Sequence, residues 1–323
     1  MKKRTGHALA ALCIAAAAVP LSAQAAWPSD APIEVVVGFA PGGTTDVMAR
    51  VLAPYIAKHL GDKASLVIVN RPGASGEIAV SQVMRAKPDG YTVGIVNLPG
   101  YFFVPMYRKA SYATKDLTLV ARVVSDPTVM VTRKDSKLRD LPQVVQALKA
   151  SPGAYSAGHN GIGTNGHLAM ARLERAAGVK LNNIPYNGSA QQKTALAGSQ
   201  PDIAFLAAPE VPDPDNEATP VRLLAQFTRE KVQRLSGVPT THELGYAVDM
   251  TAERGFAAPN GLPAPVLERL QGAIEAAMKD PEYVKAARND APFLSFLGGA
   301  EWTRQIAQDR KAYEEIAKNL PKE

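Results

Sequence analysis

Cysteine is almost absent from this chain: Cys13 is the one cysteine among 323 residues, and it lies in an apolar stretch near the N-terminus. The rest of the chain can form no disulfide bond and no thiolate metal site. Ala10-Ala11-Leu12 departs from the sequence that precedes a lipidated cysteine, so we expect no lipid anchor. Aromatic residues are few, at 6%, and a mean hydropathy of −0.09 excludes a polytopic membrane protein.

The first 25 residues have the pattern of an export signal. Lys2-Lys3-Arg4 precede an uncharged, mostly apolar run over 8–21, and Ala23-Gln24-Ala25 offers the small residues that a signal peptidase requires. That run is too short to span about 30 Å of hydrocarbon as a helix. We therefore predict a signal peptide over 1–25, cleaved after Ala25, and a periplasmic protein.

The excess of basic residues is small once the export signal is set aside. Cleavage after Ala25 removes three positive charges and no negative one, which lowers the formal charge from +6 to +3. No cluster of lysine and arginine is interleaved with aromatic residues, so we expect no nucleic-acid partner.

Downstream of Trp27, short apolar runs alternate with segments of helical periodicity, which predicts two α/β lobes with strands buried on both faces. Strands are expected at 33–39, 66–69, 91–96, 128–131, 155–157, 184–186, 203–206 and 223–226. Helices are expected at 76–86, 141–150, 189–197 and from Pro265, and Asp140 is the expected N-cap of the second. A last helix, which carries Trp302 and Ile316, is expected to pack on the first lobe.

Two glycine-rich loops each join the end of a predicted strand to the start of a predicted helix. The first is Pro41-Gly42-Gly43-Thr44-Thr45-Asp46, whose paired glycines let backbone N–H groups converge at a helix N-terminus. Such a place suits a carboxylate or a phosphate without any lysine or arginine. Thr44 or Thr45 is a candidate N-cap and hydroxyl donor, and Asp46 is better suited to brace the loop. Considered alone, the loop fits a plain Gly-Gly turn equally well.

The second loop, Asn160-Gly161-Ile162-Gly163-Thr164-Asn165-Gly166-His167, contains Gly-x-Gly-x-x-Gly, the pattern of a dinucleotide-binding turn. The next strand region, 183–187, has no acidic residue to hold a ribose hydroxyl, and an exported protein meets no pool of NAD. A second anion cradle is therefore the favoured interpretation. His167 is expected to support this loop by hydrogen bonding rather than to act as a base.

Patterns of catalysis and metal binding are missing from the sequence. There is no Gly-x-Ser-x-Gly elbow, no Walker loop and no His-Glu-x-x-His segment. The histidines beyond the export signal are scattered. We therefore expect no cofactor, no metal and no catalytic residue, and for Arg71 both an anion contact and a salt bridge stay open.

Several motifs together resemble the Bug (TctC-type) receptors, which are the extracytoplasmic solute-binding proteins of tripartite tricarboxylate transporters. In chain order they are Phe39-Ala40-Pro41-Gly42-Gly43-Thr44-Thr45-Asp46, Asn70-Arg71-Pro72-Gly73-Ala74-Ser75-Gly76, Pro88-Asp89-Gly90-Tyr91-Thr92, Gly161-x-Gly163-Thr164-x-x-His167-Leu168-Ala169, Ile184-Pro185-Tyr186-Asn187-Gly188, Val238-Pro239-Thr240 and Arg254-Gly255-Phe256-Ala257-Ala258-Pro259-x-Gly261-Leu262-Pro263. The resemblance covers essentially the whole chain after the export signal.

The resemblance implies an α/β fold of the type II periplasmic binding protein kind, with a ligand cleft between two lobes and a hinge of crossing strands. Residues 26–122 and 251–323 would form lobe 1, and residues 123–250 lobe 2. It implies a monomeric binding protein, not an enzyme, that captures a small organic carboxylate by lobe closure and delivers it to membrane transporter subunits. The implied ligand contacts are Pro41, Gly42, Gly43, Thr44, Asn97, Leu98, Pro99, Gly161, Ile162, Gly163, Thr164, Asn165, Asn187 and Gly188, with Asp46, Arg71, His167, Leu206 and Ala207 in support.

One departure from the family pattern concerns the ligand. Many relatives carry Asp or Asn just after the strand that corresponds to 203–206, where this chain has Ala207 and Ala208. That absence argues against an amino-acid ligand, because no side chain there can pair with its ammonium group. A less polar or aromatic carboxylate would instead be favoured by Phe102, Phe103, Phe205 and Leu206.

Two other functions stay open on the sequence alone. A periplasmic partner of a sensor kinase would bind the same ligand and close in the same way. An exported hydrolase would need a nucleophile and a base in partnership, and the sequence shows no such pair.

Overall fold

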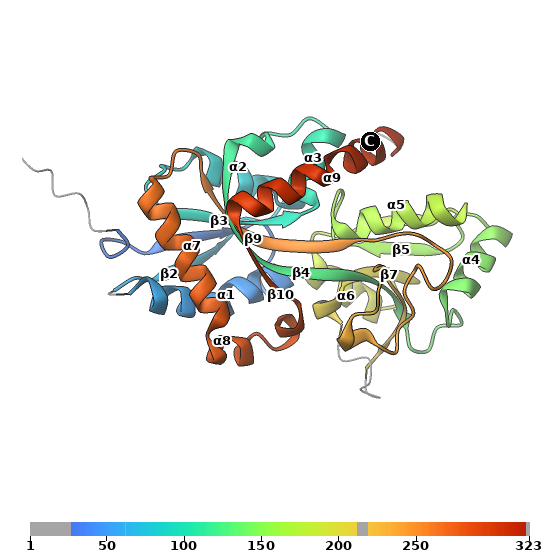
Figure 1. Cartoon of the computed structure of the whole chain (residues 1–323). Helices are drawn as coiled ribbons and strands as arrows, with labels where there is room; N and C mark the ends of the chain where they lie inside the picture. The colour runs from blue at the N-terminus through green and yellow to red at the C-terminus, as the bar shows by residue number, and fades with distance from the viewer. Residues whose placement is uncertain (1–26, 62, 212–218, 321–323) are drawn as a thin grey trace, which may run out of the picture.

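Two α/β bodies lie side by side and are joined by long strands in the computed structural model (Figure 1). The structure describes residues 27–61, 63–211 and 219–320, so the predicted signal peptide lies outside the described residues. One ten-stranded sheet passes through both bodies in the order β2-β1-β3-β9-β4-β7-β5-β6, with β8 and β10 each paired to β4. No helix within the described ranges combines the length and apolar character needed to cross a membrane.

Lobe 1 is built on three parallel strands, and alternate side chains of the first, Ile33–Val37, are buried on opposite faces. Val35 and Val37 enter one core while Val36 enters the other, which explains why the strand reads as a continuous apolar run. The strands are β1 (Ile33–Val37), β2 (Leu66–Asn70) and β3 (Thr92–Leu98), with β10 (Leu294–Gly298) antiparallel to β4. The first core lies under α1 (Thr44–Leu60) and α7 (Ala264–Lys279), beside α8 (Pro281–Ala286), and the second under α2 (Glu77–Arg85) and α3 (Gly100–Tyr107).

Lobe 2 repeats this arrangement with shorter strands. They are β5 (Ser156–His159), β6 (Asn182–Pro185), β7 (Ile203–Ala207) and β8 (Val221–Gln226). Its helices are α4 (Leu141–Ala150), α5 (Asn165–Ala177) and α6 (Ser189–Ala197). The predicted cap of α4 is confirmed, since Asp140 Oδ1 accepts a hydrogen bond from the backbone N–H of Gln143 at 2.7 Å.

Two strands, β4 (Leu117–Arg133) and β9 (Thr251–Pro259), cross between the lobes. β4 pairs with β9 from Leu117 to Pro127, and then with β7 and β8 from Thr128 onward. The sequence predicted a strand only at 128–131. Register irregularities between Leu119 and Ala121 and between Arg122 and Val124 interrupt the alternation that would have revealed the first part of β4.

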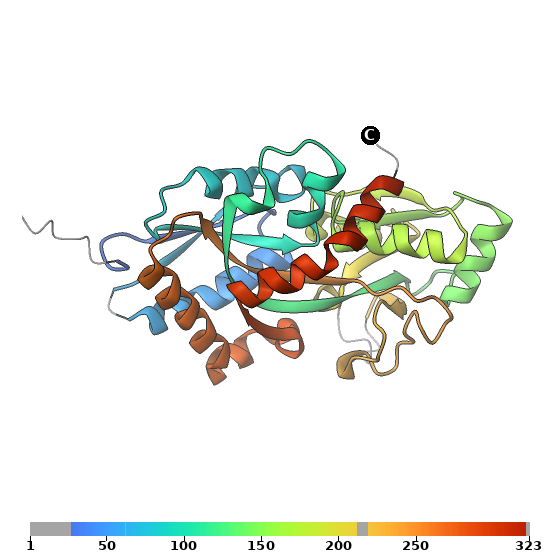
Figure 2. The same ribbon diagram turned by 45° about the horizontal axis from the view of Figure 1, so that its top comes forward.

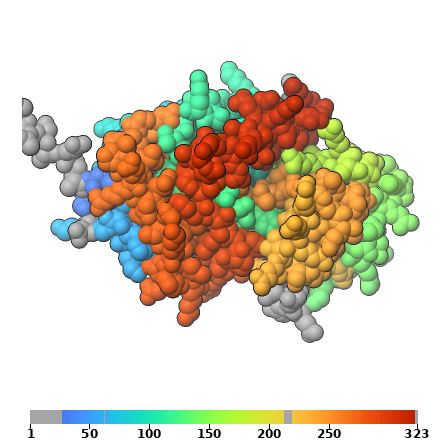
Figure 3. Space-filling model, viewed as in Figure 1, coloured from blue at the N-terminus to red at the C-terminus, as the bar shows by residue number. Residues whose placement is uncertain are grey.

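The last helix, α9 (Gly299–Asn319), packs on both lobes (Figure 2). Trp302 is fully buried in lobe 1, where its Nε1–H donates to Glu253 Oε2 at 2.7 Å. Farther along, Ala317 belongs to the lobe 2 core and the guanidinium of Arg172, on α5, lies 5.8 Å from the centre of the Tyr313 ring. The space-filling view shows α9 reaching from one body toward the other (Figure 3). The expectation that this helix packs on the first lobe therefore describes its first half only.

Candidate ligand-binding site

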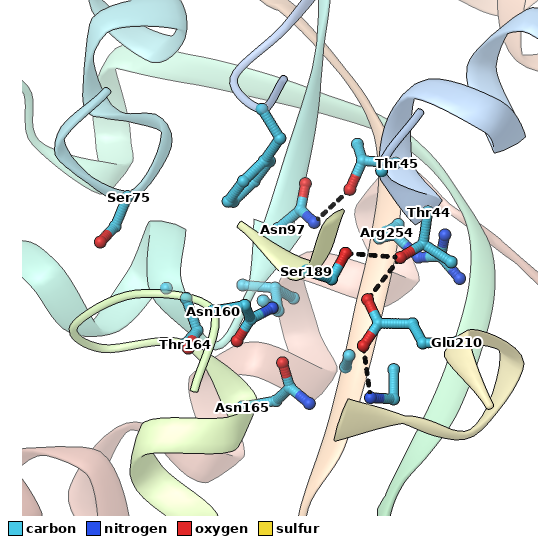
Figure 4. Close-up of a pocket in the computed structure, with 16 residues that line it drawn as sticks. Thr44, Thr45, Ser75, Asn97, Asn160, Thr164, Asn165, Ser189, Glu210 and Arg254 are labelled. Atoms are coloured by element: carbon cyan, nitrogen blue, oxygen red, sulfur yellow. Dashed lines mark hydrogen bonds between the residues drawn. The ribbon is translucent and has the colours of Figure 1, made fainter. Parts of the chain in front are cut away.

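A small pocket, with a cavity volume of about 30 Å³, lies between the two lobes and takes its lining from both (Figure 4). Lobe 1 contributes Phe39, Gly43, Thr44, Thr45, Ser75, Asn97, Leu98 and Gly100, lobe 2 contributes Asn160, Thr164, Asn165, Ser189, Ala207 and Glu210, and β9 adds Ala252 and Arg254. Many of these residues follow the carboxyl ends of parallel strands, where α/β sheets commonly bind ligands.

Four helices begin at this pocket. Thr44 is the first residue of α1, Gly100 of α3, Asn165 of α5 and Ser189 of α6, and all four line the pocket. The N-terminus of a helix carries partial positive charge and backbone N–H groups without intrahelical partners. Because two of these helices belong to lobe 1 and two to lobe 2, an anion in the pocket would interact with both bodies at once.

Asp46 holds the first glycine loop in shape. Its Oδ2 accepts from the backbone N–H of Gly42 at 2.9 Å, its Oδ1 accepts from Asn70 Nδ2 at 2.8 Å, and Arg50 forms an ion pair with it at 2.9 Å. Burial opposes the charge of this carboxyl, yet the hydrogen bonds from Arg50, Gly42 and Asn70 keep the pKa of Asp46 below its ordinary value. The loop is therefore braced from behind, and Thr44 and Thr45 are left on the pocket side.

Two buried histidines shape the second glycine loop. The backbone N–H of Gly163 donates to His167 Nδ1 at 3.1 Å, and the Thr164 hydroxyl donates to the carbonyl of Gly161 at 2.6 Å. Burial lowers the pKa of His167 to about 3 and that of His159 to about 4. Both rings are neutral at neutral pH, so Nδ1 of His167 is free to accept the Gly163 hydrogen bond.

The two lobes are in direct contact across the pocket. The Thr44 hydroxyl donates to Glu210 Oε1, and its oxygen lies 3.2 Å from Ser189 Oγ. The other carboxylate oxygen, Glu210 Oε2, accepts from the backbone N–H of Ala207 at 2.9 Å. These contacts join the start of α1 to two segments of lobe 2, as Figure 4 shows.

A buried ionic cluster reaches the pocket through Arg254. Arg254 pairs with Asp126 and, at 3.1 Å, with Asp290, and all three side chains are almost completely buried. Burial, reinforced by the nearby carboxylate of Asp290 and only partly offset by Arg254, raises the pKa of Asp126 to about 7. Arg254 Nη1 has no hydrogen-bond partner among the described residues.

Comparison with known proteins identifies the family. The sequence model of TctC, the tripartite tricarboxylate transporter family receptor, matches residues 48–319. The chain belongs to this family. It is 32% identical to the Cupriavidus necator "UPF0065 protein in gbd 5'region", over 98% of this chain and 96% of that protein, and 32% identical to BugT of Bordetella pertussis, over 85% and 84%. A protein of R. palustris solved "with adipate" superposes with a TM-score of 0.82 and 28% identity, covering 90% of this chain and 97% of that one.

These findings confirm the Bug (TctC-type) resemblance and the two-lobed α/β periplasmic-binding-protein fold that it implied. The likeness extends over nearly the full length of the proteins compared. The predicted contacts of this TctC-family chain can therefore be compared with the pocket residue by residue.

About half of the predicted ligand contacts line the pocket itself: Gly43, Thr44, Asn97, Leu98, Thr164 and Asn165, together with the predicted supporting residue Ala207. Others line adjoining hollows. One hollow contains Gly161, Ile162, Asn187 and Gly188 and shares Phe39, Ser75 and Asn160 with the pocket, whereas another contains Gly42 and shares Thr44 and Glu210.

Seven predicted residues line none of these three hollows: Pro41, Asp46, Arg71, Pro99, Gly163, His167 and Leu206. A side chain at Gly163 would meet Phe103 and Val104 of α3 at about 3 Å, because this glycine faces the contact between the lobes. Arg71 is exposed and donates to Gln82 Oε1 at 3.1 Å, and Leu206 is buried in a lobe 2 core.

The prediction that four apolar residues near the ligand favour an aromatic or weakly polar carboxylate is wrong, because none of the four lies at the pocket. Phe102, Phe103, Phe205 and Leu206 are all buried in hydrophobic cores, and none of them lines the pocket. The aromatic ring in the lining belongs to Phe39. Phe205 and Leu206 are neighbours on β7, a strand buried on both faces, so they point to different cores, and Phe102 and Phe103 are buried on helix α3.

Several residues that line the pocket were not predicted from the sequence as ligand contacts: Ser75, Ser189, Ala252, Glu210 and Arg254. Ser189 opens a helix that was predicted, and its place after Gly188 resembles that of Thr44 after Gly43. Arg254 belongs to a motif of the family resemblance, but only the cross-strand pairing of β3 with β9 brings it opposite Asn97. Glu210 follows β7 by three residues and carries no motif that marks it.

Proposed function

We propose that this protein is a periplasmic solute-binding receptor that captures a small organic carboxylate between its lobes and delivers it to the membrane subunits of a tripartite tricarboxylate-type transporter. The observation that carries the proposal is the meeting of four helix N-termini, at Thr44, Gly100, Asn165 and Ser189, at one interlobe pocket. The R. palustris relative solved with adipate supports a carboxylate as the ligand class.

Binding and closure are coupled because each lobe holds only part of the site. A carboxylate that contacts the start of α1 and the starts of α5 and α6 gains all its hydrogen bonds only when the lobes are together. A hydrogen bond to a charged group contributes about 1.5–3 kcal/mol. A few such bonds are enough to shift a hinge equilibrium of a few kcal/mol toward the closed form.

We place the division of the lobes at residues 26–122 with 251–323, and 123–250. The irregular pairing between Arg122 and Val124 of β4, opposite Arg254 and Gly255 of β9, supports a hinge at this point. Beyond Pro127, β4 gains its partners from lobe 2 alone.

Capture rather than catalysis fits the chemistry of the lining. Among the lining residues there is no histidine, lysine or cysteine. The two histidines of the neighbouring loop are buried, and the pKa of each is held at about 4 or below. The hydroxyls of Thr44 and Ser189 therefore have no histidine or lysine beside them in the lining, and the carboxylate that accepts from Thr44, that of Glu210, also accepts from the backbone N–H of Ala207.

The direct test is native mass spectrometry of the protein purified from the periplasm, followed by calorimetry with the acid that co-purifies. We expect one acid per chain, released on unfolding, and a chain that begins at Ala26. Cells that lack the gene should lose uptake of that acid while they keep the membrane subunits. Co-purification of an uncharged or purely cationic compound would contradict the proposal.

A further inference from the structure

We infer that the ligand of this pocket carries an ammonium group in addition to its carboxylate, and that Glu210 is the residue that receives the ammonium. The inference rests on the proposed function, because it takes the pocket to be the ligand site. It narrows the ligand class from small carboxylates in general to zwitterionic amino carboxylates.

The first observation is a carboxylate in a pocket that otherwise suits an anion. Glu210 lines the pocket and is 8% exposed. Its two oxygens accept from the Thr44 hydroxyl and from the backbone N–H of Ala207, which are both uncharged donors. No lysine, arginine or histidine of the described chain lies within ion-pair distance of it. A buried charge is ordinarily paired, so a positive group is missing at this place.

The second observation is that the one cation in the described lining already faces two carboxylates. Nη2 of Arg254 pairs with both Asp126 and Asp290, and its Nη1, which has no partner among the described residues, can donate to the carboxylate end of a ligand. One guanidinium thus stands among three acidic side chains once Glu210 is included. A ligand that brings a second carboxylate to this side of the pocket meets repulsion, whereas an ammonium group compensates the excess of acid.

The third observation is an excess of unused hydrogen-bond acceptors. Asn97 and Asn160 both line the pocket, and each has a buried Oδ1 without a partner among the described residues. Asn97 Nδ2 is already engaged with Thr45 Oγ1 at 2.8 Å. An ammonium group has three donors and no acceptor, and a buried acceptor left unpaired is costly, so the lining favours a ligand rich in donors.

One part of the lining suits a negatively charged group and another part suits a positively charged group, as the two ends of a zwitterion require. The helix starts at Asn165 and Ser189 suit the carboxylate, and Glu210 suits the ammonium. Alanine at positions 207 and 208 therefore does not count against an amino-acid ligand. The acidic side chain absent at those positions is supplied by Glu210, at the end of the short 3-10 helix Ala208–Glu210.

Calorimetry with matched pairs of ligands tests the inference. The pairs are L-aspartate with succinate, L-glutamate with glutarate, and L-alanine with propionate, so that the members of each pair differ by the amino group. We expect the amino member to bind at least tenfold more tightly in at least one pair. Glu210→Gln should weaken binding of that amino member at least tenfold and leave its unaminated partner unchanged or tighter.

Glu230→Gln is the matched control, because Glu230 is exposed on the same lobe and does not line the pocket. It should bind every compound as the unmodified protein does. If the unaminated acids bind as tightly as the amino acids or more tightly, the inference is wrong while the proposed function stands. If no acid of either kind binds, the proposed function fails and the inference with it. The comparison within each pair uses the unmodified protein, so it does not depend on the folding of any variant.

Discussion

The hydroxyl oxygens of Thr44 and Ser189 lie 3.2 Å apart across the boundary between the lobes, although 145 residues separate them along the chain. Each residue is the first of a helix, α1 and α6 respectively. Because the single hydroxyl proton of Thr44 is given to Glu210, the Ser189 hydroxyl is the donor of this pair. The two helix starts are thus tied together through side chains that also line the pocket.

Removing the Thr44 hydroxyl tests this tie. In Thr44→Val the shape is kept, but the hydrogen bonds to Glu210 and Ser189 are lost. We expect about a tenfold to hundredfold loss of ligand affinity, since a hydrogen bond to a charged group contributes about 1.5–3 kcal/mol. Calorimetry measures the affinity, and small-angle scattering should show a larger radius in the unliganded variant.

Thr194→Val is the control for this substitution, because the Thr194 hydroxyl donates only within α6, to the carbonyl of Ala190 at 3.1 Å. Equal affinity for all three proteins would show that the interlobe bonds do not contribute to capture.

The ionic cluster beside the pocket should make a large contribution to stability. Arg254→Met removes the one cation and leaves Asp126 and Asp290 buried without it. Breaking a buried pair in this way costs about 3–5 kcal/mol. Urea unfolding followed by circular dichroism gives the free energy of unfolding.

Arg304→Met provides the comparison, because Arg304 and its partner Glu301 are both more than half exposed on α9. An exposed pair is worth at most about 1 kcal/mol. A similar small loss for Arg254→Met would mean that the cluster is more hydrated than its burial implies.

Lowering the pH should destabilise the protein through His167. Its pKa falls from an ordinary 6.5 to about 3 in the folded protein, because burial disfavours the imidazolium. The unfolded chain therefore binds the proton first, so stability present above pH 6.5 is lost as the pH falls. Two pH units below 6.5, the burial of neutral His167 lowers the free energy of unfolding by about 3 kcal/mol.

Other buried groups contribute to the same pH range, so the comparison needs a variant. His159, with a pKa of about 4, acts in the same direction as His167. Asp126, with its raised pKa, acts in the opposite direction, because its protonated form is favoured in the folded state and its stabilising effect is lost as the pH rises through about 7. His167→Gln should flatten the dependence of unfolding free energy on pH between 6.5 and 4.5, and an unchanged slope would contradict the assignment.

Substituting alanine for each of two helical glycines should change the free energy of unfolding in opposite directions. A Cβ at Gly299, the first residue of α9, would lie 1.9 Å from the carbonyl oxygen of Leu119, so Gly299→Ala forces the helix away from β4. We expect a loss of about 1–3 kcal/mol. Gly272, on the exposed side of α7, has no atom within 4 Å of such a Cβ, so Gly272→Ala should gain about 0.5–1 kcal/mol. Thermal unfolding of both variants measures the difference, and equal effects would contradict the close approach of α9 to β4.

Local sequence was enough to predict the parts of the fold that depend on neighbouring residues. The helix over 141–150 has its cap at Asp140, and β1, β2 and β3 lie within a residue or two of the expected runs. These elements are set by periodicity and capping, which a short window of sequence contains. The glycine loops were located for the same reason, since each follows a recognisable strand.

Features that depend on residues far apart in the chain could not be predicted. The length of β4 arises from partners in both lobes, and its irregular register hides the strand pattern. Glu210 and Arg254 enter the pocket only because β7 and β9 both pair with β4. The division of α9 between two cores likewise follows from how the lobes sit together, which no window of sequence contains.

The position of β9 has a consequence for how the chain is made. It lies between β3 and β4 in the middle of the sheet, with Gly94 opposite Ala257, so the first body lacks a central strand until the final quarter of the chain is available. Pairings between such distant segments form slowly, because a long loop must close first. The first body thus remains incomplete until β9, Thr251–Pro259, has been made. For a protein that is threaded across a membrane before use, as proposed here, this delay keeps it competent for passage.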